Sequence, residues 1–194
     1  PIEGVDVAID PLDELGRPTG NPTTEPDISG EVCIRADHVR DGYDRLWVTD
    51  HAASQPAGWH RSGDIGHFDT AGRLWIEGRL VHVISTGGGP VSPVAIEHAA
   101  RSLPAVDLAA AVGVGPTGTQ QVVVVVAPAD RPRRAGLASA ALADGVRAAV
   151  DIDVAAVLAA PALPVDKRHN SKIDRTRVAA WAERVLSGER IGRM

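Results

Sequence analysis

The sequence predicts an α+β protein, with a β-rich piece from residue 1 to about 78, a compact α/β lobe over residues 79–187 and a tail over residues 188–194. Three observations predict this fold class. Apolar and polar residues alternate in the first piece with the period of two that is typical of half-buried strands. After residue 79, strands alternate with stretches of helical spacing. A run of five valines, residues 122–126, predicts a strand buried on both faces.

The first piece contains four expected strands. Residues 5–10 and 31–35 alternate apolar and polar side chains, and a loop rich in proline, glycine and threonine separates them. Residues 64–69 and 73–77 flank the short segment Thr-Ala-Gly at 70–72. A glycine-containing connection of this length between two such runs predicts a β-hairpin.

Strands and helices alternate in the second piece. Ser92 followed by Pro93 predicts a helix N-cap and first turn, and the next apolar residues fall on one helical face. Two further helical stripes run over residues 142–150 and 178–186. The expected strands of this lobe are residues 81–85, 106–114, 122–127 and 152–158.

Composition and charge restrict the class of function. With 194 residues, 44% of them hydrophobic, the chain can bury a core, and its net charge of −5 provides no basic field for nucleic acid. No apolar run has the length of a membrane helix, nothing resembles a secretory signal, and the single cysteine, Cys33, excludes an internal disulfide framework. We therefore expect a soluble, cytoplasmic protein. The start at Pro1, without an initiator methionine, predicts a piece of a longer chain.

Lysine is unusually rare. Of the 20 lysines and arginines, only Lys167 and Lys172 are lysines. An arginine-rich codon bias explains the general depletion but not these two exceptions. Because the compact ammonium charge cannot be replaced by the planar guanidinium group where chemistry needs a point charge, both lysines are candidates for a chemical role.

Several segments partly match known cofactor-, phosphate- or metal-binding motifs, but their surroundings do not support those functions. The segment Gly-Val-Gly-Pro-Thr-Gly at 113–118 matches the dinucleotide-binding fingerprint, but a valine-rich strand follows it where a helix should receive the pyrophosphate, so we expect a strand-to-strand turn. The three glycines at 87–89 lack the Lys-Ser/Thr of a phosphate loop and are expected to form a flexible connector. The seven histidines show no metal-ligand spacing, so no metal site is predicted. Cys33 is expected to be a small buried hydrophobe.

Three segments, in this order, resemble motifs of the adenylate-forming superfamily, which includes acyl-CoA synthetases, peptide-synthetase adenylation domains and luciferases. Residues 59–64, Trp-His-Arg-Ser-Gly-Asp, resemble the Tyr-Arg-Thr-Gly-Asp motif. Gly78-Arg79 resembles the start of the hinge, and residues 163–175 resemble the terminal lysine motif. Gly30-Glu31-Val32 and residues 91–97 are also similar to family motifs. The resemblance implies that residues 1–78 are the distal β-rich part of an N-terminal adenylation domain and that residues 79–187 are its mobile C-terminal lobe.

The resemblance implies roles for five residues and implies two cofactors. Asp64 binds the ribose of ATP, since its carboxylate has acceptor sites for both vicinal hydroxyls. Arg79 lies near the same ribose. Lys172 is the catalytic lysine, which offsets the charge of a carboxylate meeting a triphosphate. Val81 and His82 occupy the hinge, where family members commonly have charged residues. ATP and Mg²⁺ are the implied cofactors.

The residues around Lys172 also allow a purely structural explanation. Ser171 and Asp174 are suited to a capping-box-like helix start, which places Lys172 in the first helical turn. Because the helix dipole slightly disfavours a cation there, a lysine at this position favours a chemical role.

The segment Pro-Val-Asp-Lys-Arg-His-Asn-Ser-Lys-Ile at 164–173 resembles the β-lactone synthetases of olefin biosynthesis. That branch activates a long-chain β-hydroxy acid as acyl-AMP, and the β-hydroxyl then displaces AMP to close a β-lactone. The implied partners are the N-terminal adenylation domain of the same chain, the β-hydroxy acid and other hydrocarbon-pathway enzymes. Residues 1–194 alone are expected to be inactive.

Two alternatives are left open. A long-chain fatty acyl-CoA or acyl-carrier ligase agrees with the superfamily resemblance but not with Arg168-His169-Asn170. A noncatalytic ligand-binding or assembly module is the alternative from another class, since no phosphate-binding Ser/Thr/Gly loop occurs in these residues.

Overall fold

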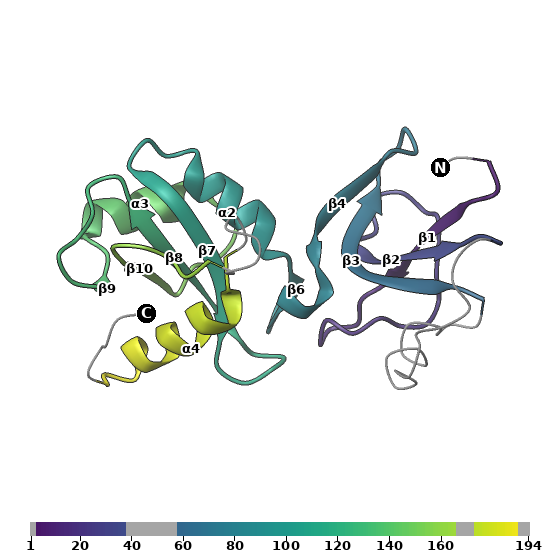
Figure 1. Cartoon of the computed structure of the whole chain (residues 1–194). Helices are drawn as coiled ribbons and strands as arrows, with labels where there is room; N and C mark the ends of the chain where they lie inside the picture. The colour runs from purple at the N-terminus through teal and green to yellow at the C-terminus, as the bar shows by residue number, and fades with distance from the viewer. Residues whose placement is uncertain (1–2, 38–57, 166–172, 190–194) are drawn as a thin grey trace. The chain divides into compact units, whose positions relative to one another are not determined.

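The computed structural model describes residues 3–37, 58–165 and 173–189. The chain divides into two compact units, residues 1–83 and 84–194 (Figure 1). The predicted boundary after residue 78 lies five residues before this division. In the part of the chain that is described, no helix has the length and apolar character needed to cross a membrane.

The first unit contains a four-stranded antiparallel sheet. Its strands are β1 (Asp6–Pro11), β2 (Gly30–Arg35), β3 (His60–Phe68) and β4 (Leu74–Arg79), in this spatial order. Ile9, Val32 and Phe68 form its core. The four strands expected from alternation are confirmed, with ends shifted by up to four residues.

Two irregularities shape this sheet. The register of β2 against β3 shifts between Glu31 and Cys33, and that of β3 against β4 shifts between Ile65 and Gly66. Such bulges increase local twist and change where side chains point. At Gly66 the strands approach so closely that a Cβ atom would lie 2.2 Å from the carbonyl oxygen of Trp75. Glycine is therefore required where the second bulge sits.

The segment that ends the first unit corrects one prediction. The expected strand at 81–85 is instead a turn of 3-10 helix, η1 (Leu80–His82), followed by strand β5 (Ile84–Thr86). The side chain of Val81 is 82% exposed, so this valine does not belong to a buried strand face. The division between the units falls directly after Val83, beside Val81 and His82. Their hinge role stays a prediction.

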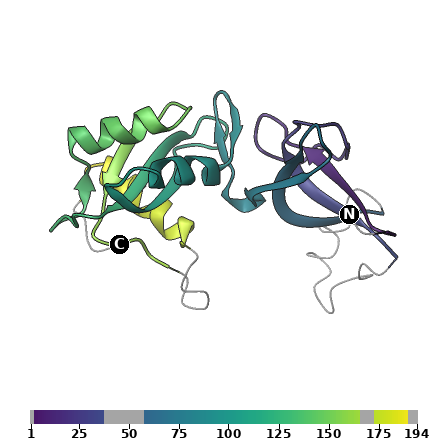
Figure 2. The same cartoon turned by 90° about the horizontal axis from the view of Figure 1, so that it is seen from above.

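The second unit is a mixed sheet with helices on both faces. The strand order is β7 (Val106–Val114), β8 (Gln121–Pro128), β10 (Ala156–Ala159) and β9 (Gly136–Leu137), and only the β8–β10 pair is parallel. Helices α2 (Pro93–Arg101) and α3 (Ala140–Ala149) cover one face, and α4 (Arg175–Leu186) covers the other (Figures 1 and 2).

The valine run lies in β8, and its side chains pack on both faces of the sheet. Val122, Val124 and Val126 pack in the cluster that contains residues of α2 and α3. Val123 and Val125 pack in the other cluster, with Val178 and Trp181 of α4. All five valines are at most 3% exposed, which confirms the prediction of a strand buried on both faces.

The turns of this unit support one expectation and correct another. The glycine-rich segment at 113–118 joins β7 to β8, as expected for a strand-to-strand turn. The glycines at 87–89 are not merely a connector, because they form the tip of a hairpin between β5 and β6 (Gly89–Val91). The strand expected at 152–158 begins only at Ala156.

Helix starts follow local capping chemistry. Ser92 caps α2, as predicted, and accepts the backbone N–H of Val94. The last helix differs from its prediction, because Asp174 is its N-cap and accepts the N–H of Arg177 at 3.1 Å. Lys172 therefore precedes the cap in sequence and does not belong to the first helical turn, so the helix dipole does not favour a chemical role for it.

Candidate functional site

Asp64 of β3 and Arg79 of β4 lie opposite each other. They are register partners, and Nε of Arg79 is 3.1 Å from Oδ1 of Asp64. Their side chains are 37% and 59% exposed, so a ligand can reach both. The structure thus brings together the two residues that the resemblance assigned to one ribose. A carboxylate beside a guanidinium group offers acceptors for hydroxyl protons and strong donors for ligand oxygens.

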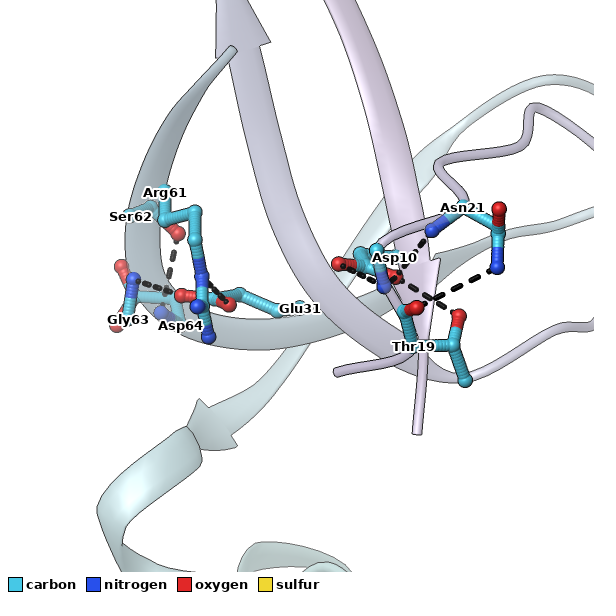
Figure 3. A network of polar contacts seen from close by, with 9 residues as sticks. Asp10, Thr19, Asn21, Glu31, Arg61, Ser62, Gly63 and Asp64 are labelled. Carbon is cyan, nitrogen blue, oxygen red and sulfur yellow. Dashed lines mark hydrogen bonds and ion pairs between the residues drawn. The ribbon is translucent and has the colours of Figure 1, made fainter. Parts of the chain in front are cut away.

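A buried carboxylate holds the backbone that carries Asp64. Glu31 of β2 is 2% exposed, its Oε1 accepts the N–H of Gly63 at 3.0 Å, and its Oε2 faces Nε of Arg61 (Figure 3). The hydroxyl of Ser62 accepts the N–H of Asp64 at 3.0 Å. Hydrogen bonds to Glu31 and Ser62 therefore hold the backbone and side chains of residues 61–64 in place.

Gly63 has two reasons to be glycine. Its φ of +73° is left-handed, where a side chain is strained. A Cβ atom there would also lie 3.3 Å from Nη2 of Arg79 and crowd the guanidinium group. The glycine before Asp64 therefore provides the room that Arg79 occupies.

A second buried carboxylate lies across the strand pair. Asp10 is the register partner of Glu31, and its oxygens accept hydrogen bonds from Thr19, Gly20 and Asn21 (Figure 3). These bonds hold the loop after β1 against the sheet. Both carboxylates are thus satisfied inside the first unit.

These carboxylates affect Cys33. Burial, together with the negative charges of Glu31 and Asp10, raises the pKa of the Cys33 thiol from 9.0 to about 12. Since the thiolate is the nucleophilic form, Cys33 is unreactive at neutral pH. Its role as a small buried residue is confirmed.

Lys172 lies outside the described residues, together with Lys167 and Ser171. The described residues beside this segment are anchored to each other. Val165 and Ile173 form an antiparallel bridge, and the N–H of Asp174 donates to the carbonyl of Pro164 at 2.9 Å. Ile173, which follows Lys172 in sequence, is therefore held directly before the start of α4.

A buried ion pair joins α4 to α2 at the same place. Glu97 of α2 is 6% exposed and accepts two hydrogen bonds from Arg175, at 2.8 Å from Nε and 2.6 Å from Nη2. Its Oε1 also accepts the N–H of Ala111 in β7 at 3.1 Å. This fork geometry is the strong form of an ion pair.

No role for Glu31, Glu97 or Arg175 was expected from the sequence, although all three lie in segments that resemble family motifs. The only local signal was an acidic residue within an apolar pattern, at Glu31 between strand residues and at Glu97 beside Ile96. Such a residue is unfavourable unless a donor pairs with it. The donor for Glu97 lies 78 positions away, so the pattern does not identify it.

Comparison with known sequences finds longer relatives, while no family model matches. Olefin beta-lactone synthetases of Xanthomonas campestris pv. campestris and Stenotrophomonas maltophilia are each 37% identical over 131 residues, 63% and 66% of this chain. A probable CoA ligase of Humulus lupulus is 42% identical over 90 residues, 46% of this chain. The chain spans 23% of each synthetase and 17% of the ligase.

Comparison with solved structures finds the same fold in longer chains. ATP-bound MatB from Rhodopseudomonas palustris superposes with a TM-score of 0.72 at 22% identity, covering 93% of this chain and 34% of that one. Amide bond synthetase McbA from Marinactinospora thermotolerans gives a TM-score of 0.71 at 27% identity, covering 92% and 35%. The fold of this chain is thus found in about a third of each longer protein.

Proposed function

We propose, from the premise that this chain matches the C-terminal part of adenylate-forming enzymes in sequence and fold, that it works as that part of an ATP-dependent enzyme. The enzyme activates a fatty carboxylic acid as its acyl-AMP. The observation that carries the proposal is the pair of Asp64 and Arg79, two reachable side chains of opposite charge side by side. The preceding adenylation region of the same protein is the partner that the reaction needs.

Each residue has a defined task in this reaction. A carboxylate oxygen of the acid attacks the α-phosphorus of ATP, and the bond from that phosphorus to pyrophosphate breaks. The carboxylate of Asp64 accepts hydrogen bonds from the ribose hydroxyls, and Arg79 donates to the same sugar. Lys172 supplies a cation where the anionic acid meets the triphosphate, which lowers the barrier by offsetting charge. Glu31 keeps Asp64 in place through Gly63.

Mg²⁺ accompanies ATP in this proposal. It is usually bound by substrate phosphates and one or two carboxylates. Over residues 3–37, 58–165 and 173–189, no group of three or more potential ligands occurs. We therefore assign no residue of this chain to the metal and derive no step from it.

The product that we propose is a β-lactone made from a long-chain β-hydroxy acid. The 37% identity to two olefin beta-lactone synthetases supports this choice. In the second step the β-hydroxyl oxygen attacks the acyl carbon, the bond from that carbon to the AMP oxygen breaks, and the hydroxyl proton passes to solvent water. No thiol acceptor takes part. Other enzymes of hydrocarbon synthesis are the proposed pathway partners.

A fatty acyl-CoA ligase is the second candidate. The 42% identity to a probable CoA ligase over 90 residues favours it. In that case the thiol of coenzyme A attacks the acyl-AMP in place of the β-hydroxyl. The two candidates share the first step and differ only in the nucleophile of the second.

The test uses the full-length enzyme that contains this chain, with ATP and a long-chain β-hydroxy acid. We expect pyrophosphate release without coenzyme A and a product lighter than the acid by one water in mass spectrometry. A thioester formed only with coenzyme A would support the ligase. No pyrophosphate release under either condition, with a range of acids, would support a noncatalytic module.

Substitution of the two lysines tests the catalytic assignment. Lys172→Ala and Lys172→Arg should each reduce acyl-AMP formation by about 100- to 1000-fold, the effect of losing one preorganised charge contact. Lys167→Ala is the matched control, because it removes the other lysine of the chain, and it should retain more activity. Near-normal adenylation by Lys172→Ala would refute the assignment.

A further inference from the structure

We infer that Glu97 and Arg175 are positioning residues for Lys172. They fix the start of α4, and Ile173 at that start follows the lysine directly in sequence. The inference rests on the proposed function, in which Lys172 is the catalytic lysine. Nothing in that function assigns Glu97 or Arg175 a contact with substrate.

The ion pair between Glu97 and Arg175 fixes the orientation of its side chains more than it adds stability. A carboxylate that is 6% exposed is costly unless every oxygen is bonded, and Glu97 receives two donors from Arg175 and one from Ala111. Apolar residues of similar volume commonly stabilise a core as well as a buried ion pair does. An ion pair with fork geometry, however, permits one orientation of the guanidinium group. The pair therefore sets the position of Arg175 relative to α2 and β7.

Backbone hydrogen bonds link Arg175 to Ile173, the residue that follows Lys172 in sequence. The N–H of Arg175 donates to the carbonyl of Ile173 at 3.1 Å, and Asp174 is bonded to Pro164. Ile173 is in turn bridged to Val165. Arg175 is thus held by its side chain from α2 and by its backbone from the residues that precede α4.

The consequence concerns rate more than binding. Catalytic charges must lie close to their productive position, and a misplacement of about 1 Å can reduce the rate about 100-fold. Weakening the pair should therefore reduce the turnover of adenylation. The KM for ATP should change little, because Asp64 and Arg79, which are proposed to bind the ribose, belong to the first unit.

The experiment combines Glu97→Gln and Arg175→Lys with Lys172→Ala in the full-length enzyme. Each single variant should lower kcat for acyl-AMP formation by about 10- to 100-fold with KM for ATP unchanged. In the Lys172→Ala background the same changes should have less than about a twofold further effect, since residues that act through one group are not additive. Asp144→Asn, which removes an exposed partner of Arg147, is the control and should leave kcat unchanged.

Two kinetic results would overturn the inference. One is an equal fold-loss in kcat in the presence and absence of Lys172, and the other is a parallel rise of the KM for ATP. Hydrogen exchange of the chain provides a readout without activity, in which Glu97→Gln should speed exchange at Asp174 and leave β8 protected. Unchanged exchange at Asp174 would also refute it. Failure of the unaltered enzyme to form acyl-AMP would instead count against the proposed function. Arg175→Lys keeps the charge and serves where Glu97→Gln does not fold.

Discussion

Glu31→Gln tests whether the buried carboxylate supports the segment that carries Asp64. Glutamine keeps one acceptor oxygen for the N–H of Gly63, but its amide nitrogen then faces the donor of Arg61. Breaking a buried ion pair by removing one charge costs about 3–5 kcal/mol. Because Arg61 is 23% exposed, water recovers part of this cost, and we expect a loss of about 2–3 kcal/mol in the free energy of unfolding.

Thermal unfolding of the chain measures this loss. For a unit of this size it corresponds to a fall in Tm of roughly 8–24 °C. Hydrogen exchange followed by mass spectrometry should assign the change to β2 and β3 and leave the second unit unaffected. Asp6→Asn is the matched control, since the pair of Asp6 and Arg35 is 63% and 54% exposed and such pairs contribute little. A fall in Tm no larger than that of the control would refute the supporting role of Glu31.

Three further predictions concern the first unit. Asp64→Asn should weaken ATP binding by the full-length enzyme about 10- to 100-fold in calorimetry, because hydrogen bonds to a charged group are lost, and an unchanged Kd would exclude the ribose role. Since burial raises the pKa of Cys33 from 9.0 to about 12, the folded chain keeps a proton that the unfolded chain has lost. The free energy of unfolding should therefore be unaffected below about pH 9 and fall by up to about 1.4 kcal/mol per pH unit towards pH 12, a slope that Cys33→Ala should lack in urea titrations. Gly66→Ala should destabilise the unit by about 1–3 kcal/mol in the same titrations through its clash with Trp75, whereas Gly87→Ala, which meets nothing within 4 Å, should be neutral.

The elements of this fold were largely predictable because their signals are local. Alternation located the first two strands, since every second apolar residue packs on one core, Val7 and Ile9 from β1 and Val32 and Ile34 from β2. Helical spacing located α2, α3 and α4, because the apolar residues of each helix lie on the one face that packs on a core. Two of the misplaced features, η1 and the cap of α4, lie where the chain leaves a regular element, and apolar spacing carries no information there.

The sequence by itself determined the order of the longer strands and helices, the valine strand buried on both faces and the motifs that single out Asp64, Arg79 and Lys172. Only the tertiary structure decided that Asp64 and Arg79 meet, because their pairing depends on a register that shifts at Gly66. It also decided the contacts of Glu97 with Arg175, which lies on another helix. Hydrophobic period reports which face of an element is buried. It does not identify the charged residue on a neighbouring element that pairs with a buried charge, since that pairing depends on how the elements pack.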